Sequence, residues 1–246
     1  MHGIICYVLE RIVAQSAPVL FLPGTLCDER IWLPTWQKLS LNQRRYVPLQ
    51  WATSKDDMLS LTGDRVLDDE KVHLVGYSMG GFIAALWAIK NPQHVTSLTL
   101  IGYDANGLSN DELARRKQLV SLLEKGQFLP DNPAYVERFV HPSRLNDATV
   151  TDVVKEMATD LGKSTLLAHT KSTTPRESTL KSLSKINVPI NIVAASDDAV
   201  APYSALAKMH HALPSSTLYT FENTAHMLPL EQPEKLATLL QGCTGA

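Results

Sequence analysis

The sequence predicts an α/β protein: a mostly parallel β-sheet with helices on both faces and a small helical cap. Three observations carry this prediction. Short apolar runs alternate with segments of helical periodicity, and several of the runs are apolar throughout, as strands covered on both faces should be. One long stretch without a strand signal interrupts the alternation. We therefore expect one sheet with crossover helices and one helical insertion.

Seven short apolar runs are predicted to be strands. They cover residues 4–9, 18–22, 46–49, 72–75, 98–101, 188–193 and 217–219. No basic residue precedes the first run, which leads into Glu10 and Arg11, so we interpret it as a strand and not as a signal peptide. An apolar helical run from Phe82 to Ile89 follows the fourth strand and ends before Pro92.

The long interval without strands is predicted to be an inserted cap. It is far longer than the roughly 10 to 15 residues of an ordinary crossover helix. We expect the core to comprise residues 1–106 and 186–246, and the cap to comprise residues 107–185. Such a cap could not stand alone, so we expect it to lie over the sheet.

Two helices are predicted inside this cap. One is expected from Leu113 to Leu123, behind the start signal Ser109-Asn110-Asp111. The other is indicated by a one-face apolar stripe that consists of Val150, Val153, Val154, Met157 and Leu161. Several prolines divide the segment into short pieces.

Charge and composition exclude several classes of protein. The 246 residues contain 23 Lys plus Arg and 25 Asp plus Glu, a formal net charge of −2. Without a basic patch, nucleic acid and membrane surfaces are not expected as partners. The 3 Cys form no CxxC pair and fit a reducing compartment, and no run approaches the roughly 20 apolar residues of a membrane span. We expect a soluble, cytoplasmic protein, and its oligomeric state stays open.

The strongest motif is Gly76-Tyr77-Ser78-Met79-Gly80, between a predicted strand and a predicted helix. This Gly-x-Ser-x-Gly pattern makes a turn so tight that the serine takes a positive φ and the residues two positions away must lack side chains. Gly76 and Gly80 meet that demand. The helix that follows directs free N–H groups toward any oxyanion formed there. Ser78 is therefore predicted to be a nucleophile.

A nucleophilic serine needs a base, and the base needs an acid that orients it. In this type of site the chain order is Ser, then Asp or Glu, then His. His226 follows the last predicted strand and is expected to be the base. Asp198 follows the strand before that and is expected to be the acid. Asp197 and Asp104 remain alternatives for the acid, since each also follows a strand.

Two backbone N–H groups are expected to stabilise the oxyanion. One belongs to Met79, directly after the nucleophile, and the other to Thr25, in a loop that follows a strand. Gly24 lets this loop bend close to Ser78. Cys27 in the same loop is expected to be a buried structural thiol and not a second nucleophile.

Two other motifs are not expected to bind a ligand. Leu161-Gly162-Lys163-Ser164 imitates the end of a phosphate loop, but Met157 stands where that motif needs a glycine. The pair His210-His211 has no convergent third ligand, so no metal site is expected. The sequence thus predicts neither a metal nor a cofactor.

Together these motifs resemble the α/β-hydrolase superfamily over essentially the whole chain. The opening from Leu22 to Asp28 is most similar to that of small bacterial hydrolases. More loosely, the chain resembles carboxylesterases that cleave acyl-carrier methyl esters and the lyase of menaquinone synthesis. It departs from the family in two places: Pro23 replaces a common histidine, and residues 50–54 replace the usual Asp-x-x-Gly-x-Gly-x-Ser loop. The resemblance implies an α/β-hydrolase fold with Ser78, Asp198 and His226 as the catalytic residues.

We expect a serine hydrolase that cleaves a carboxylic ester or thioester of a small or medium acyl substrate through an acyl-enzyme on Ser78. The alternative is a triad-dependent lyase or C–C bond hydrolase that acts on a carboxylated metabolite. In that case a cationic residue of the cap would bind the carboxylate, with Arg115, Arg138 and Arg176 as candidates. A ligand-binding module without turnover is a third hypothesis, against which the complete triad argues.

Overall fold

The computed structural model describes residues 17–130 and 132–245. In this part of the chain six parallel strands form one sheet in the order β2-β1-β3-β4-β5-β6. The strands are β1 Val19–Leu22, β2 Arg44–Tyr46, β3 Val72–Tyr77, β4 Val95–Ile101, β5 Ile190–Ala195 and β6 Ser216–Phe221. The predicted fold class is thereby confirmed. The strand predicted at 4–9 lies outside the described residues.

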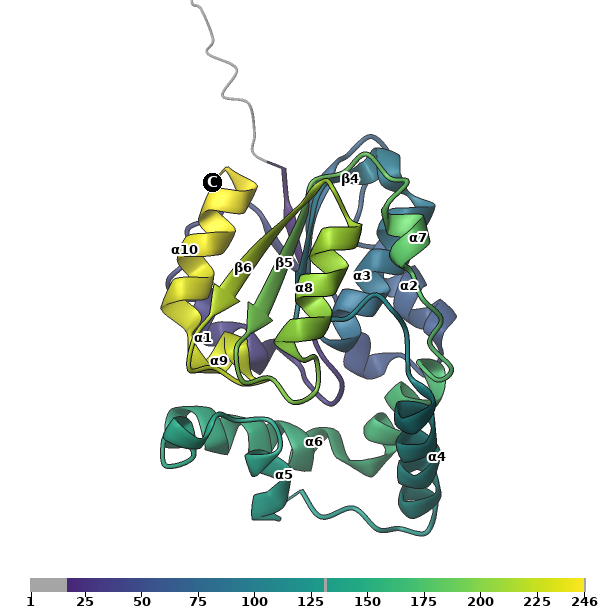
Figure 1. Cartoon of the computed structure of the whole chain (residues 1–246), viewed down its shortest axis with the longest axis vertical. Helices are drawn as coiled ribbons and strands as arrows, with labels where there is room; N and C mark the ends of the chain where they lie inside the picture. Colours follow the sequence, from purple (N-terminus) through teal and green to yellow (C-terminus); the bar gives the residue numbers. More distant parts are fainter. Residues whose placement is uncertain (1–16, 131, 246) are drawn as a thin grey trace, which may run out of the picture.

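Helices lie on both faces of the sheet and beyond the carboxyl ends of its strands (Figure 1). The α-helices are α1 Leu33–Trp36, α2 Lys55–Gly63, α3 Met79–Lys90, α4 Asn110–Glu124, α5 Pro133–Glu137, α6 Ala148–Ser172, α7 Leu180–Leu183, α8 Tyr203–Ala212, α9 Leu228–Glu231 and α10 Pro233–Thr244. The short 3-10 helices are η1 Glu29–Ile31, η2 Leu49–Trp51, η3 Pro92–His94 and η4 Pro142–Arg144. Within the described ranges, none of these helices has the length and apolar character needed to cross a membrane.

Side chains that alternate along the strands divide the core into two halves. Leu20 and Leu22 of β1 belong to the half that also contains apolar side chains of α2, α3, α7 and α8. Val19 and Phe21 belong to the other half, together with side chains of α10 and the segment around α1. Because successive residues of a strand point to opposite faces, a strand apolar throughout fits between two helical layers. This explains why the apolar runs predicted the central strands.

Two of the strands change direction or begin at a proline and so differ from their predicted ranges. β2 ends at Tyr46 and not at Leu49: the Val47 N–H still donates to the Phe21 carbonyl at 3.0 Å, but the chain turns at Pro48 and the Leu49 N–H donates back to the Val47 carbonyl at 2.9 Å. β5 begins at Ile190, directly after Pro189, and runs two residues beyond the predicted end. The other predicted strands of the described region overlap the observed ones.

Helices α4, α5 and α6 of the segment between β4 and β5 lie across the carboxyl ends of the strands (Figure 1). Gly162 interrupts α6 with φ 70° and ψ −178°, a conformation that only glycine adopts readily. α6 thus has two halves that meet at Gly162, and its second half extends beyond the predicted stripe to Ser172. Val150, Val154 and Met157 of the stripe pack in one buried cluster with Ile31. These side chains serve packing against the sheet domain.

Candidate active site

Ser78 lies at the turn between β3 and α3, with φ 52° and ψ −112°. Its N–H donates to the carbonyl oxygen of Ile101 at 2.8 Å. A Cβ atom added at Gly76 would lie 2.5 Å from the carbonyl oxygen of Gly80, and one added at Gly80 would overlap the backbone of Leu22. Only glycine fits at either position, so the sequence motif produces the turn for a steric reason.

The structure brings Ser78, His226 and Asp198 together. Ser78 Oγ lies 3.0 Å from His226 Nε2, and His226 Nδ1 lies 2.7 Å from Asp198 Oδ2. The histidine is 4% exposed and the aspartate 5%. A carboxylate next to Nδ1 favours the tautomer that carries its proton there, which leaves the Nε2 lone pair facing the hydroxyl. This arrangement can move the hydroxyl proton to the imidazole.

Asp198 is held in place by the loop that follows β5. Its Oδ1 accepts hydrogen bonds from the N–H groups of Val200 at 2.7 Å and Ala201 at 2.9 Å, which leaves Oδ2 for the histidine. The side chain of Asp197 is 51% exposed and accepts a hydrogen bond from the Ser196 hydroxyl. Of these two adjacent aspartates, Asp198 is therefore the one that meets the histidine.

Two side chains hold the loop that carries His226. The Tyr77 hydroxyl donates to the carbonyl oxygen of His226 at 2.9 Å. Glu231 Oε2 accepts from the N–H groups of Ala225 at 3.1 Å and His141 at 3.3 Å, and burial raises the pKa of this carboxyl. Sequence reasoning missed both supports. The only local signal was that Tyr77 and Glu231 stand within a few residues of predicted site residues.

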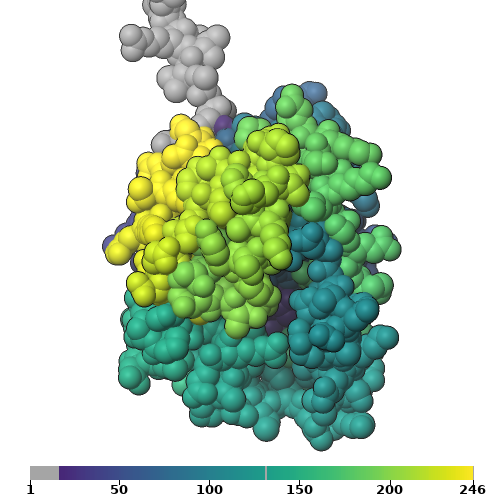
Figure 2. Space-filling view, in the orientation of Figure 1, coloured from purple at the N-terminus to yellow at the C-terminus, as the bar shows by residue number. Residues whose placement is uncertain are grey.

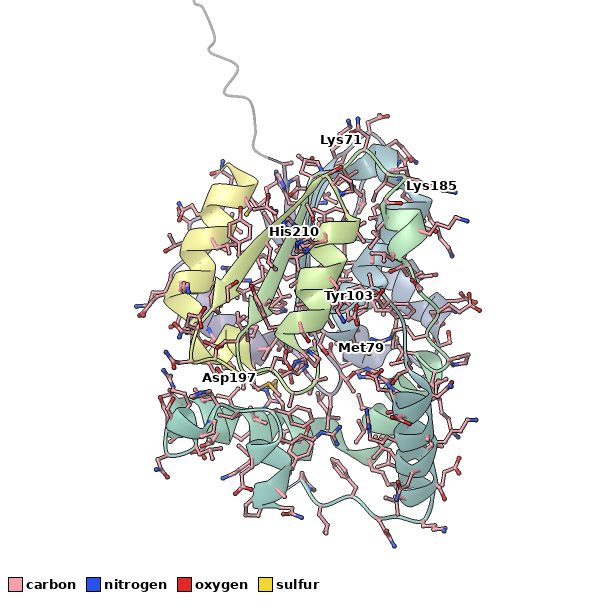
Figure 3. All side chains as sticks on the ribbon, viewed as in Figure 1. Lys71, Met79, Tyr103, Lys185, Asp197 and His210 are labelled. Atoms are coloured by element: carbon pink, nitrogen blue, oxygen red, sulfur yellow. The ribbon has the colours of Figure 1, made fainter. Side chains whose placement is uncertain are left out.

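The two expected oxyanion donors come from the first residue of α3 and from the loop after β1, whose Thr25 lines the same cavity as Ser78. Met79 is the first residue of α3, whose first-turn N–H groups have no acceptor within the helix. Figure 3 shows Met79 near the end of the sheet that faces the inserted helices, whereas Lys71 lies at the opposite end. A Cβ added at Gly24 would lie 3.4 Å from Ser78 Cβ, so the loop after β1 approaches closely. Among the described residues we find no acceptor for the Thr25 N–H.

A cavity of about 320 Å³ opens at Ser78 and His226, between the sheet edge and the inserted segment. Its wall is mainly apolar and includes Leu119, Leu123, Phe128, Leu129, Phe139 and Leu166. Figure 2 shows a hollow where teal atoms of the inserted segment meet atoms of the core, with purple atoms of the N-terminal part at its base. Cavities of this size bind small organic ligands in other proteins.

Two arginines also line the cavity, and no acidic side chain of the described residues joins them. The Arg116 guanidinium donates to the hydroxyl oxygens of Thr173 at 3.1 Å and Thr174 at 3.3 Å. The Arg138 guanidinium lies 5.5 Å from the centre of the Phe139 ring. The cavity is therefore positively charged at two points of an otherwise apolar wall.

Only one of the three arginines expected to bind a carboxylate lines this cavity. Arg138 does, whereas Arg176 lies over the Phe82 ring at 4.7 Å and Arg115 is exposed on α4. Sequence reasoning missed Arg116. Helical spacing could have found it, because Arg116 shares one face of α4 with the cavity residues Leu119 and Leu123.

The remaining candidates have other surroundings. Cys27 is 2% exposed, and burial raises the pKa of its thiol to about 12, the opposite of what a nucleophilic thiolate needs. Asp104 accepts a hydrogen bond from the N–H of Asn106 at 2.9 Å. His210 Nδ1 lies 2.8 Å from the Ser216 hydroxyl. No group of three or more metal-ligating side chains is found in the described ranges.

Comparisons with known proteins identify the same fold family that the sheet and helices indicate. The chain matches the family model described as "alpha/beta hydrolase fold" over residues 65–233. It is 28% identical to monoacylglycerol lipase ABHD6 of Bos taurus, over 96% of this chain and 77% of that protein. It is 27% identical to a pimeloyl-[acyl-carrier protein] methyl ester esterase of Neisseria meningitidis, over 70% of this chain and 56% of that protein.

Solved structures share the fold over nearly the whole chain. A thermophilic esterase from Thermogutta terrifontis superposes with a TM-score of 0.78 at 19% identity, covering 93% of this chain and 89% of that one. An esterase from Exiguobacterium antarcticum superposes with a TM-score of 0.75 at 20% identity, covering 94% and 93%. The parallel sheet, the turn at Ser78 and the family match over more than half of the sequence lead to one conclusion: this chain belongs to the α/β hydrolase fold family.

Proposed function

We propose that this protein is a serine hydrolase that cleaves a carboxylic ester or thioester of a small or medium acyl substrate through an acyl-enzyme on Ser78. The observation that supports it is the unbroken chain of contacts from Ser78 Oγ through the His226 ring to Asp198, at 3.0 and 2.7 Å. This chain opens on a mainly apolar cavity. The names of two relatives, a lipase and a methyl ester esterase, favour ester bonds as well.

In the proposed reaction His226 Nε2 takes the hydroxyl proton while Ser78 Oγ attacks the carbonyl carbon. Asp198 holds the imidazole in the required tautomer and stabilises its charged form. The Thr25 and Met79 N–H groups donate to the oxyanion. The imidazolium then gives its proton to the departing alcohol or thiol, and the acyl group stays on Ser78. A water molecule deprotonated by the same imidazole attacks the acyl carbon; the bond to Ser78 Oγ breaks, the imidazolium returns the proton to Oγ, and the acid is released.

We further propose that the cap, residues 107–185, supplies the acyl pocket, while the core, residues 1–106 and 186–246, supplies the triad. The apolar cavity side chains of α4 and of the loop after it belong to the cap. Burial of apolar chain against them would stabilise binding by about 0.8 kcal/mol for each methylene group. Chain-length preference should therefore depend on cap residues.

The test compares wild type and Ser78→Ala on a panel of p-nitrophenyl and CoA esters of increasing acyl length, together with labelling by a fluorophosphonate. Loss of the nucleophile is expected to lower kcat by at least about 10³-fold and to abolish labelling. Ser172→Ala is the matched control, since the Ser172 hydroxyl donates to the Thr53 carbonyl at 3.0 Å and does not line the cavity.

Two outcomes would contradict the proposal. One is hydrolysis of p-nitrophenyl acetate at the wild-type rate by Ser78→Ala. The other is saturable ligand binding by the wild type with no turnover of any ester, which would favour a binding module.

A second candidate function is a triad-dependent lyase or C–C bond hydrolase acting on a carboxylated metabolite. The observation that favours it is the pair Arg116 and Arg138, which line the cavity without an acidic side chain among its described lining residues. A guanidinium group binds a carboxylate through paired N–H donors, and such pairs are strong where water is excluded. An anionic substrate end would therefore find a partner there.

Arg116→Gln tests this reading with two esters of equal length, p-nitrophenyl valerate and the mono-p-nitrophenyl ester of glutarate. If Arg116 binds an anionic group, kcat/KM for the glutarate ester should fall about 10-fold or more, and that for valerate much less. Arg115→Gln on the exposed face of α4 is the control. Equal changes for both esters would argue against an anionic substrate.

A further inference from the structure

His169 is a fully buried histidine that takes no part in the contacts between Ser78, His226 and Asp198. It lies in the second half of α6, and its side chain has no exposed surface. Buried polar side chains nearly always have hydrogen-bond partners. The two partners of this ring are backbone groups of the sheet domain, so a helix of the inserted segment is joined to the core at this point.

The ring of His169 bridges two loops. The Leu26 N–H donates to His169 Nδ1 at 3.2 Å, and His169 Nε2 lies 3.0 Å from the carbonyl oxygen of Leu49. Because an amide N–H only donates and a carbonyl oxygen only accepts, the ring carries its proton on Nε2. Burial lowers the pKa of His169 to about 4, so the ring is neutral near pH 7. The two contacts therefore select one neutral tautomer.

The Leu26 N–H belongs to the peptide that directly follows Thr25. The turn from Gly24 to Cys27 is closed by the Cys27 N–H, which donates to the Gly24 carbonyl at 3.3 Å, and Leu26 has φ 53°. A positive φ at the third position is typical of a type II turn, where glycine is the usual residue. A leucine there persists only where its surroundings hold it.

The hydrogen bond to His169 fixes the orientation of the Thr25–Leu26 peptide, which is the peptide whose orientation distinguishes a type I from a type II turn. In a type I turn the Thr25–Leu26 peptide is turned over, which would take the Leu26 N–H away from His169 and aim the Thr25 carbonyl at the Nδ1 lone pair. Both turn types have a φ of about −60° at the second position, so turning over this peptide does not by itself rotate the Thr25 N–H. The contact acts on the position of the turn: it ties the peptide next to Thr25 to α6, while a Cβ added at Gly24, on the other side of Thr25, would lie 3.4 Å from Ser78 Cβ.

We infer that His169 is a positioning residue for the oxyanion site: by accepting from the Leu26 N–H it holds the 24–27 turn so that the Thr25 N–H faces Ser78. The inference rests on the proposed function, since an oxyanion forms only if Ser78 attacks a carbonyl. The inserted segment then supports transition-state stabilisation as well as the pocket. Loss of this support should lower kcat and leave KM nearly unchanged, because oxyanion donors act mainly on the transition state.

Two conservative variants separate this role from plain packing. In His169→Asn the side-chain oxygen can occupy the place of Nδ1 and accept from the Leu26 N–H, while the contact with Leu49 is lost. In His169→Gln the amide nitrogen can occupy the place of Nε2 and donate to the Leu49 carbonyl, while the contact with Leu26 is lost. Each variant loses one buried hydrogen bond. A merely structural histidine predicts similar effects on activity in both.

The readouts are kcat and KM for p-nitrophenyl butyrate, the urea midpoint of unfolding, and the inhibition constant of a trifluoromethyl ketone whose adduct with Ser78 carries an oxyanion. His169→Gln is expected to lower kcat about 10- to 100-fold and to raise the inhibition constant of the ketone by a similar factor. It is expected to change KM by less than about threefold. His169→Asn is expected to retain kcat within about threefold although its unfolding midpoint also falls.

A second buried histidine provides the matched control. His73 is 6% exposed, its Nδ1 lies 2.7 Å from the Ser97 hydroxyl, and it stands near the amino end of β3, away from the cavity. His73→Gln is expected to lower the unfolding midpoint and leave kcat unchanged. It shows what loss of a buried imidazole does when no oxyanion donor depends on it.

Equal kcat losses in His169→Asn and His169→Gln, or a loss confined to KM, would overturn the role of His169 and leave the proposed function intact. A wild type that hydrolyses no ester and is not labelled on Ser78 by a fluorophosphonate would overturn both. If His169→Gln does not fold, ¹⁵N NMR of the wild type decides: a protonated Nδ1 at neutral pH would mean that the Leu26 N–H has no acceptor there, and the inference would fall.

Discussion

The hydroxyl of Tyr77 donates a hydrogen bond to the backbone carbonyl of His226 at 2.9 Å. Tyr77 directly precedes Ser78, so the residue before the proposed nucleophile holds the backbone of the proposed base. The tyrosine ring is 1% exposed, and its centre lies 5.2 Å from that of the imidazole. This contact joins the turn after β3 to the loop after β6 and limits how far the two reacting side chains can separate.

Tyr77→Phe is expected to lower kcat about 3- to 10-fold, equivalent to roughly 1 kcal/mol in the barrier, because the histidine loop loses its anchor. The free energy of unfolding should fall by about 1–2 kcal/mol, since the buried carbonyl loses its donor. Hydrolysis of p-nitrophenyl acetate and urea unfolding measure the two effects. Tyr103→Phe is the control: its hydroxyl lies 2.9 Å from the Thr179 hydroxyl, and its ring is equally buried. A similar drop in kcat in both variants would contradict a positioning role for Tyr77.

Asp198→Asn is expected to lower kcat by about 10³- to 10⁴-fold with little change in KM. An amide NH₂ facing His226 Nδ1 favours the tautomer with its proton on Nε2, which cannot accept the serine proton. Asp197→Asn, on the neighbouring exposed side chain, should change kcat less than about twofold. Steady-state rates on one ester decide the matter. If Asp197→Asn has the larger effect, the neighbouring aspartate is the acid.

Features with local signals could be predicted from the sequence. β1 is apolar in every position and β3, β4 and β5 are mainly apolar because both faces of the sheet are covered, and the turn at Ser78 needs glycine two residues to either side. The contacts of Tyr77, Arg116 and His169 could not be predicted, because each depends on which segments meet in space. Leu26 and His169 are 143 positions apart, and no residue pattern links them. The end of β2 could not be predicted either. The apolar run continues to Leu49, but the hydrogen bonds to β1 stop where the chain turns at Pro48.

Gly80→Ala is expected to lower the free energy of unfolding by at least about 2 kcal/mol and to abolish activity. The new methyl group would overlap the backbone of Leu22 and Pro23, which cannot move aside without disturbing the loop after β1. Gly242→Ala is the control, and its free energy of unfolding is expected to rise instead of fall. Apart from the chain neighbours and the nearby backbone of α10, no atom lies within 4 Å of a Cβ added there, so alanine should stabilise the helix by up to about 1 kcal/mol. Urea unfolding of both variants measures the difference, and a loss of similar size in each would contradict the steric argument.

His169 should also make stability depend on pH. Burial lowers its pKa from 6.5 to about 4, so the unfolded chain binds a proton at higher pH than the folded one does. Stability from this group is complete above about pH 6.5 and is lost as the pH falls from there toward 4. A difference of this size corresponds to about 3 kcal/mol between pH 7 and pH 4.

His169→Asn isolates that contribution because the variant has no ring to titrate at this position. As the pH falls from 7 to 4, the wild type should lose stability relative to the variant, and the gap between their free energies of unfolding should change by about 3 kcal/mol. Other titrating groups, including His73, whose pKa is also lowered by burial, are present in both proteins and cancel. Urea unfolding at four or five pH values measures the gap. A constant gap would mean that the folded protein accepts a proton on this ring as readily as the unfolded chain does, which a neutral bridge between the Leu26 N–H and the Leu49 carbonyl does not allow.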